Sequence, residues 1–298
     1  MPELPEVETV TNEIRPYVLG QRIKEVEVYW PGTVKGNTVA EFVNGLKGQT
    51  VTGVSRRGKF IVWQLSGGKR MLTHLKMTGA LITQEANLAP PPYNRVEITL
   101  ENGLKVYFRD PRKFGRMRII EHDKAFDELG PEPLEPEFTA EVLESILEKR
   151  KGPIKPTLLD QTLIAGIGNM YADEALFEAK IHPLRAADSL SSTEYQRLYQ
   201  AIQNVLRTAI ESKGASISNY VRPGGELGHA HFAFKVAHRR GENCPVCGGP
   251  VERIVVRGRG TYLCPQCQPV FTSKSQILIS KSQTNLKYKY QNPKYLTQ

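Results

Sequence analysis

Four cysteines in one spacing pattern constrain this chain more than any other feature. They form one C-x2-C pair at 244–247 and a second at 264–267, with sixteen residues between the pairs. Two thiolates on each tight turn can bind one ion, and two such turns complete the tetrahedron of a structural zinc site. A redox CxxC would need only one pair and would leave the other unexplained. The pattern therefore predicts one structural Zn²⁺ held by Cys244, Cys247, Cys264 and Cys267.

The segment between the cysteine pairs reads VERIVVRGRGTYL and predicts a β-hairpin with RGRG at its tip. Glycines flank Arg257 and Arg259, so both would stand on a tight projection held by the metal. An arginine so placed can reach a phosphate in a groove. Two solvated arginines on an ordinary turn would give the same local sequence, so this pattern alone leaves both interpretations open.

The charge balance of the 298 residues favours a polyanionic partner. Forty lysines and arginines oppose 31 aspartates and glutamates, giving a formal net charge of +9 and a pI of about 9.3. Nucleic acid is the commonest such partner. No apolar run approaches the roughly 18 residues that span a bilayer, and the acidic N-terminus lacks the plan of a signal peptide. We therefore expect a cytoplasmic protein with reduced cysteines and no membrane partner.

The periodicity of apolar residues in the first part predicts one helix followed by antiparallel strands. Residues 5–19 place apolar side chains on one helical face, and Pro16 should end or distort that helix. Alternating segments predict strands at 24–30, 58–65, 70–77 and 115–120. A hairpin over 95–110 turns at Asn102-Gly103. This order favours a β-sandwich.

The pattern changes at the segment LGPEPLEPEF, residues 129–138, which reads as a linker because its prolines cannot continue a sheet. Helical periods follow at 139–150 and 191–214. Between them, the turn GIGN at 166–169 could present backbone N–H groups to a phosphate, with Asn169 as a further donor. A plain connection between helices gives the same pattern.

Loops near the predicted strand ends supply further candidates. A methionine, an arginine and a phenylalanine on such loops could fill a gap in stacked bases. Taken singly, Met and Phe are more often core residues, and Arg is more often a solvated charge. The candidates are Met77, Arg112 and Phe114, with Lys59 in the motif RRGKF.

The motifs together resemble those of bacterial formamidopyrimidine-DNA glycosylase, from residue 1 to about 268. In chain order they are PELPEVET, RRGKF, HLKM-x-G, DPRKFG, LGPEPL, IKP-x-LLDQ, GIGNMYADE and the finger CxxC…RGRGTYLCPQCQ. The resemblance implies an α+β multidomain protein. It would have an N-terminal helix and antiparallel β-sandwich at 1–132, a helical helix–two-turn–helix domain at 133–232, and a zinc-finger hairpin at 233–268. Residues 269–298 are expected to form a flexible tail.

The resemblance implies a base-excision repair enzyme that is monomeric and acts at the bacterial nucleoid. Damaged double-stranded DNA would lie across the cleft between the two halves. The family removes oxidised purines, such as 8-oxoguanine and formamidopyrimidines, and then cuts the strand by β- and δ-elimination.

Roles carried over from the resemblance begin at the N-terminus. Pro2, exposed once Met1 is removed, is the implied nucleophile, and Glu3 is the acid that assists opening of the sugar ring. Lys59 would donate a proton during elimination, and Arg259 is linked to the later elimination step. The implied DNA contacts are Met77, Tyr93, Arg112, Phe114, Arg150, Lys155 and Asn169.

The chemistry of proline supports this role. Its secondary amine forms an iminium with C1′ that cannot lose its charge, so the adduct stays an electron sink and acidifies the C2′ proton. An α-amino group titrates near roughly 8, so a useful fraction is neutral at cellular pH. No metal is needed for this step.

Two departures from the family concern lesion preference. Tyr93 stands where some members have a histidine that contacts DNA, and the segment 221–239, which includes the loop expected to cover the extruded base, is divergent. Two other functions stay open: an endonuclease VIII-type enzyme for oxidised pyrimidines, which shares the proline and glutamate, and a non-enzymatic zinc-finger DNA-binding protein.

Overall fold

The computed structural model describes residues 1–85, 87–121 and 126–270, which form two compact units. Unit 1 comprises Met1–Phe138, Asp160–Gly168 and Gln203–Phe234. Unit 2 comprises Thr139–Leu159, Asn169–Ile202 and the segment from Lys235 onward. The chain therefore crosses between the units several times, and the expected domain boundaries stay predictions. All but the first two residues of the expected tail lie outside the described residues.

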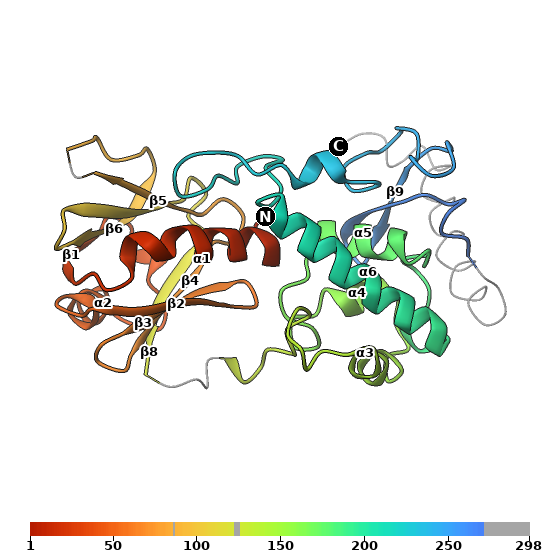
Figure 1. Ribbon diagram of the computed structural model, residues 1–298, viewed down its shortest axis with the longest axis horizontal. Helices are drawn as coiled ribbons and strands as arrows, with labels where there is room; N and C mark the ends of the chain where they lie inside the picture. The colour runs from red at the N-terminus through yellow and green to blue at the C-terminus, as the bar shows by residue number, and fades with distance from the viewer. Residues whose placement is uncertain (86, 122–125, 271–298) are drawn as a thin grey trace, which may run out of the picture. The chain divides into compact units, whose positions relative to one another are not determined.

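Unit 1 contains a long N-terminal helix and two four-stranded antiparallel sheets, as expected for a helix and a β-sandwich (Figure 1). The sheets have the strand orders β1-β6-β7-β5 and β2-β3-β4-β8. The helical elements are α1 (Leu4–Val18), η1 (Pro31–Thr33), α2 (Val39–Leu46) and η4 (Ala230–Ala233). The strands are β1 (Ile23–Val28), β2 (Val51–Arg57), β3 (Phe60–Leu65), β4 (Arg70–His74), β5 (Ala80–Glu85), β6 (Asn94–Leu100), β7 (Leu104–Arg109) and β8 (Arg116–Ile120).

The helix α1 supplies apolar side chains to a core that it shares with both sheets. Val7, Val10 and Ile14 recur at helical spacing and are fully buried in this core. Pro16 lies inside the helix and does not end it, because the helix runs on to Val18. A proline in the last turn removes only a bond near the helix end, so little is lost.

Five elements of unit 1 were not predicted from the apolar pattern: the helix α2, the strands β2 and β5, and the short helical turns η1 and η4. The β2 sequence VTGVSRR ends in two arginines, so its periodicity resembles that of a loop. It nevertheless pairs with β3 from Val51 to Arg57. The strand predicted at 70–77 ends early, at His74, because residues 75–79 form a turn in which Gly79 N–H donates to the Leu75 carbonyl.

Unit 2 is helical around a small zinc-finger hairpin. Its elements are α3 (Ala140–Leu147), α4 (Ile154–Leu158), α5 (Asn169–Glu178), η3 (Ala187–Ser189), the start of α6 (Ser192–Glu211), β9 (Glu252–Val256) and β10 (Arg259–Leu263). The two helices predicted at 139–150 and 191–214 are confirmed as α3 and α6. The α4 and α5 helices belong to the predicted helix–two-turn–helix region.

The turn of the finger hairpin has two residues, whereas the sequence predicted the four residues RGRG at its tip. Arg259 pairs with Val256, which leaves Arg257 and Gly258 as the turn and makes Arg259 the first residue of β10. Among the helices of the described ranges, none combines the length and the apolar character that a bilayer span requires.

Candidate functional site

Within unit 1, the glycine turn at 166–168 contacts Glu3 and Leu4 at the start of α1. The backbone N–H of Leu4 donates to the Gly166 carbonyl at 3.1 Å. The carboxyl of Glu3 packs against Gly168 so closely that a Cβ there would collide with it. A glycine at 168 is therefore required for the start of α1 to lie against this turn.

Glu3 is held at the start of α1 by a second glutamate. Its side chain is 1 % exposed, and its backbone N–H donates to Oε2 of Glu6 at 2.7 Å, the returning half of a capping box. The other oxygen of Glu6, Oε1, accepts from the Ala215 N–H at 2.8 Å. Pro2 is buried directly before this cap. Pro2 and Glu3 thus lie directly before the first residue of α1, at its N-terminal cap.

Lys59 reaches the same turn from the sheet. Its side chain is 8 % exposed, and Nζ donates to the Ile167 carbonyl at 2.9 Å. Gln161 fixes the turn from its other side, since its Nε2 donates to the Ile167 carbonyl and its Oε1 accepts from Gly166 N–H, both at 2.9 Å. Glu3 and Lys59 therefore meet the same three-residue turn.

The turn between β2 and β3 that carries Lys59 is anchored by a buried carboxylate, Glu132, from the predicted linker. Glu132 accepts from the guanidinium groups of Arg56 and Arg57 and from the backbone N–H of Gly58. Burial together with the approach of Lys76 and Lys59 lowers the pKa of nearby His74 to about 3, so that imidazole is neutral. His74 therefore adds no positive charge beside Lys59.

Three predicted insertion residues are brought together by Asp110, a fully buried carboxylate of the same unit. One Asp110 oxygen accepts from the Thr78 hydroxyl, next to Met77, and the other accepts from Gly115 N–H at 2.7 Å. The loops 75–79 and 110–115 are therefore tied to one group. Met77 and Phe114 are exposed on them, and Arg112 lies 4.7 Å over the Phe114 ring. Tyr93 is also exposed, and its carbonyl accepts from Asp110 N–H at 3.1 Å.

In unit 2, Asn169 and Arg259 are neighbours. Asn169 is the first residue of α5, and its Nδ2 donates to the carbonyl of Gly260 at 2.9 Å. Arg259 directly precedes Gly260 and is exposed at the start of β10. Arg150 is exposed after the end of α3. The structure thus places the α5 N-terminus beside the arginine-bearing end of the hairpin.

Lys155 is not exposed with these residues. Its ammonium is fully buried and lies 2.8 Å from Asp173 Oδ1 on α5. It also donates to the Thr261 hydroxyl and the Gly260 carbonyl, while Asp173 Oδ2 accepts from Tyr262 N–H at 3.0 Å. Burial raises the pKa of Asp173 to about 7, although Lys155 and the Tyr262 N–H oppose the rise. Lys155 therefore joins α4, α5 and β10.

The four predicted cysteines meet at the base of the hairpin. Their sulfur atoms all lie within 4.8 Å of one another, with Cys247 and Cys264 at 3.4 Å and Cys244 and Cys267 at 3.8 Å. Four thiolates at about 2.3 Å from one ion would lie about 3.8 Å apart, so the cluster fits tetrahedral Zn²⁺. All four positions are filled by protein ligands, which makes the predicted zinc structural.

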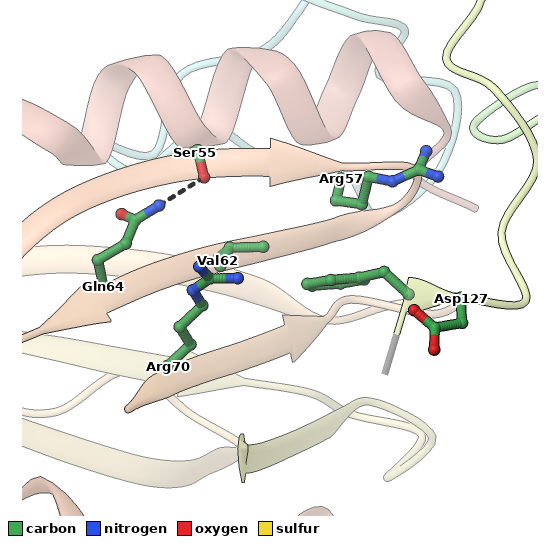
Figure 2. A pocket seen from close by; sticks show the side chains of 7 residues that line it. Ser55, Arg57, Val62, Gln64, Arg70 and Asp127 are labelled. Atoms are coloured by element: carbon green, nitrogen blue, oxygen red, sulfur yellow. Dashed lines mark hydrogen bonds between the residues drawn. The ribbon is translucent and has the colours of Figure 1, made fainter. Parts of the chain in front are cut away.

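A separate shallow pocket opens on the sheet that contains β2, β3 and β4 (Figure 2). In it, Gln64 Nε2 donates to the Ser55 hydroxyl at 2.8 Å. Arg57 turns its guanidinium to Glu132 and to the carbonyls of residues 129 and 130. None of the predicted site residues lines this pocket. The lining residues are Ser55, Arg57, Val62, Gln64, Arg70, Phe126 and Asp127.

Several residues that position the candidates were not singled out from the sequence. Four of them are buried polar side chains with partners distant in the chain, whereas Gln161 is half-buried and bonds to residues five and six positions away. A polar residue in an otherwise apolar or glycine-rich motif was their only signal in the sequence. They are Glu6, Asp110, Glu132, Gln161 and Asp173.

Family comparisons agree along the chain. Family models match at 1–117 (formamidopyrimidine-DNA glycosylase N-terminal domain), 129–221 (formamidopyrimidine-DNA glycosylase H2TH domain) and 241–270 (zinc finger found in FPG and IleRS). The formamidopyrimidine-DNA glycosylase of Desulfitobacterium hafniense is 41% identical over 273 residues, 90% of this chain and 100% of the relative. That of a Roseiflexus species is 43% identical over 272 residues, with the same coverage.

Solved structures give the same result. The crystal structure of the MutM (FPG) protein from Thermus thermophilus is similar with a TM-score of 0.82 and 41% identity, over 91% of this chain and 100% of that one. A complex of Lactococcus lactis Fpg with DNA that contains an abasic site has a TM-score of 0.84 and 33% identity, over 90% and 100%. A complex of the same protein with Fapy-dG-containing DNA has a TM-score of 0.83.

Proposed function

The chain belongs to the formamidopyrimidine-DNA glycosylase family of base-excision repair enzymes, which are both DNA glycosylases and AP lyases, and from this premise we propose that it excises oxidised purines from duplex DNA through Pro2. The substrates are 8-oxoguanine and formamidopyrimidines. The observation that supports this most is the convergence of Glu3, Leu4 and Lys59 on the turn at 166–168.

The reaction begins at the amine of Pro2 after removal of Met1. The nitrogen lone pair forms a bond to C1′, the bond from C1′ to the base breaks, and its electron pair leaves with the base, which takes up a proton. The attached nitrogen then loses its proton, and the C1′–O4′ bond breaks to open the sugar ring. C1′ and the nitrogen form an iminium, and O4′ takes up a proton and becomes a hydroxyl. The C2′ proton is then lost to water, the electrons of the C2′–H bond move toward the positive nitrogen, and the 3′ phosphate departs; a second elimination releases the 5′ phosphate. Hydrolysis of the adduct returns the amine.

Glu3 and Lys59 supply the protons in this scheme. Glu3 protonates the ring oxygen O4′ as the sugar opens, and Lys59 donates a proton during elimination. Two hydrogen bonds support these roles: Glu3 N–H donates to the Glu6 carboxylate, and the Lys59 ammonium donates to the Ile167 carbonyl. Both bonds help to hold the acid in place, and a general acid must be positioned to act. Arg259 assists the later elimination by binding phosphate.

Both units contribute DNA contacts in this proposal. A base within a duplex cannot be reached, so the nucleotide is extruded at a cost of a few kcal/mol. Met77, Arg112 and Phe114 fill the vacated space, and the loop within 221–232 covers the extruded base. Tyr93, Arg150 and Asn169 contact the backbone. Lys155 serves the interface through the hairpin, since its ammonium is buried against Asp173.

The zinc ion holds the hairpin that carries Arg259. Because its four ligands are Cys244, Cys247, Cys264 and Cys267, it offers no open position to substrate. Its contribution is to fold and fix β9 and β10.

We further propose a monomer that acts at the nucleoid in the bacterial cytoplasm, where its DNA substrate lies and where thiols stay reduced for zinc. Light scattering after size exclusion should give the mass of one 33.5 kDa chain, alone and with one duplex. A dimer mass would contradict the monomer.

A panel of lesion duplexes tests the substrate proposal. Mature, untagged protein should cut strands with 8-oxoguanine or formamidopyrimidine faster than strands with thymine glycol. An N-terminal extension must be absent, since it would block the Pro2 amine. Faster cutting of thymine glycol would instead favour the endonuclease VIII type of activity, and no cutting of any lesion would favour a DNA-binding protein without catalysis.

A further inference from the structure

Trp30 is an exposed aromatic residue that the proposed function does not use. It lies directly before η1 and is 37 % exposed. A Cβ on Gly32 would come within 2.6 Å of its indole Nε1, so the ring can lie on the backbone only because residue 32 is glycine. The indole therefore packs closely against the backbone at Gly32 and offers an aromatic face to its neighbours.

Lys113 occupies that surface. Its Nζ lies 4.0 Å from the centroid of the Trp30 ring, the distance of a cation–π contact. Lys113 has a left-handed backbone, with φ of +60°. Its neighbours Arg112 and Phe114 pair with each other, whereas its own ammonium is held by Trp30. The indole thus fixes one cation in the middle of the loop that carries two insertion residues.

The Trp30–Lys113 pair is one of several cation–aromatic pairs on this part of unit 1. Arg95 lies 6.0 Å over the Tyr93 ring. Backbone hydrogen bonds connect the pairs: Trp30 N–H donates to the Arg95 carbonyl at 3.2 Å, and Asp110 N–H donates to the Tyr93 carbonyl at 3.1 Å. The three segments are therefore tied together by main-chain bonds, which side-chain rearrangement does not break.

The cations of this surface are not neutralised by carboxylates. Within the part of the chain that the structure describes, Arg95, Arg112 and Lys113 form no ion pair. The nearby carboxylate of Asp110 is buried and accepts from Thr78 and Gly115 instead. Three uncompensated positive side chains beside exposed aromatic rings fit a polyanion with stacked bases.

We infer that Trp30 is a positioning residue of the DNA-binding surface, whose indole holds the Lys113 ammonium where it meets a phosphate of the duplex beside the lesion. This inference rests on the proposed function. It extends the DNA-contacting surface beyond the insertion loops to the segment before η1. A cation–π pair that only stabilises the loop would have the same geometry, so the test must separate these two roles.

Tryptophan fluorescence tests the location. The chain has two tryptophans, and Trp63 is fully buried, so acrylamide quenches Trp30 alone. The zinc-loaded protein is titrated with a duplex that carries a tetrahydrofuran abasic analogue, which cannot form the iminium and stays intact. We expect saturating duplex to remove the quenchable component. The Trp30→Phe variant, which keeps only Trp63, should show none with or without DNA.

The outcomes of this titration are distinct. If a labelled duplex shows binding by anisotropy while Trp30 stays fully quenchable, the inference is wrong and the proposed function stands. If the protein does not bind the duplex at all, the proposed function fails, and the inference fails with it.

Salt dependence tests the positioning role. Lys113→Met should weaken duplex binding and reduce the slope of log K against log salt by about 1, the loss of one phosphate contact. Trp30→Leu should weaken binding less, and the double variant should bind no more weakly than Lys113→Met. Trp30→Phe, which keeps an aromatic face, should restore most of the affinity. Additive losses, or a slope unchanged in Lys113→Met, would overturn the inference.

A matched control is Lys47→Met. Lys47 is exposed at the C-terminal end of α2 and has no aromatic partner among the described residues. The Lys47→Met variant loses the same charge from the same unit, so its slope of log K against log salt shows the effect of net charge alone. A slope change in Lys47→Met equal to that in Lys113→Met would contradict a specific contact.

Discussion

The ammonium of Lys155 lies 2.8 Å from the carboxylate of Asp173, and both side chains are withdrawn from solvent. Around this pair, Gly260, Thr261 and Tyr262 of β10 are bonded to one partner or the other. The residue before them is Arg259. A buried ion pair is weak evidence for stability by itself, but removal of one partner is costly, at about 3–5 kcal/mol. The pair therefore sets where the hairpin stands on α5.

Asp173→Asn should weaken duplex binding in the same direction as Lys155→Met. If Lys155 acts through the hairpin, either change loosens β10 and misplaces Arg259. Because Arg259 is a proposed phosphate contact, both changes should also reduce the slope of log K against log salt, by at most about 1. Fluorescence anisotropy over a salt series, with zinc content checked for each variant, measures both quantities.

The opposite sign would identify a direct contact. If Lys155 itself binds phosphate, Asp173→Asn would release the ammonium and tighten duplex binding, whereas Lys155→Met would weaken it. That pair of results would contradict the positioning role.

Gly168→Ala should inactivate base excision without unfolding the protein. The added Cβ would collide with the carboxyl of Glu3 and push it from the turn. A displacement near 1 Å at a reacting group can lower the rate by on the order of 10²-fold. Single-turnover excision of 8-oxoguanine measures this. Gly67→Ala is a fitting control, since its Cβ would meet only the end of the Gln49 side chain. Equal rates in both variants would show that Glu3 is not held by this contact.

Local pattern was sufficient for the features that depend on neighbours in sequence. The zinc ligands follow from two C-x2-C turns, and the hairpin of β6 and β7 follows from alternation around Asn102-Gly103. The β2 strand was not predicted because it ends in two arginines, Arg56 and Arg57. Their charge is compensated by Glu132, which is too distant in the sequence for a local pattern to reveal the ion pairs.

Long-range burial could not be read from the sequence. Lys155 looks like a surface lysine in IKP, yet its ammonium bonds to Gly260, 105 positions along the chain. Glu6 looks like a first-turn helix acid, yet it accepts from Ala215, 209 positions away. In both cases a polar side chain is buried because a distant backbone supplies its partner, and no local period records that.

Cys264→Ser should weaken duplex binding and lower the zinc content below one ion per chain. Loss of one thiolate opens the tetrahedron, and the hairpin with Arg259 loses its support. Anisotropy and metal analysis measure the two effects. The control is Val246→Ser, an exposed change in the same CPVC turn that keeps all four thiols. Full binding by zinc-free protein would contradict this role.

Acid should destabilise unit 1 through His74. Burial lowers its folded pKa to about 3 from about 6.5, and Nδ1 accepts from Lys76 N–H, which needs the neutral ring. Because the folded pKa is lowered, this contribution to stability is present above about 6.5 and is lost as the pH falls toward 3. His74→Gln should therefore lose less stability than the unmodified protein between pH 7.5 and 5.5. Urea midpoints compare them, and the difference between the proteins removes the shared effect of zinc loss. Equal losses would show that His74 does not titrate in this way.

Reduction of the covalent intermediate tests the central claim, that Pro2 is the nucleophile. Mature protein, with removal of Met1 verified by mass spectrometry, is mixed with an 8-oxoguanine duplex and borohydride. Digestion and sequencing of the trapped complex should then locate the deoxyribose adduct on the nitrogen of Pro2. Absence of trapping, or an adduct on a lysine such as Lys59, would contradict the account.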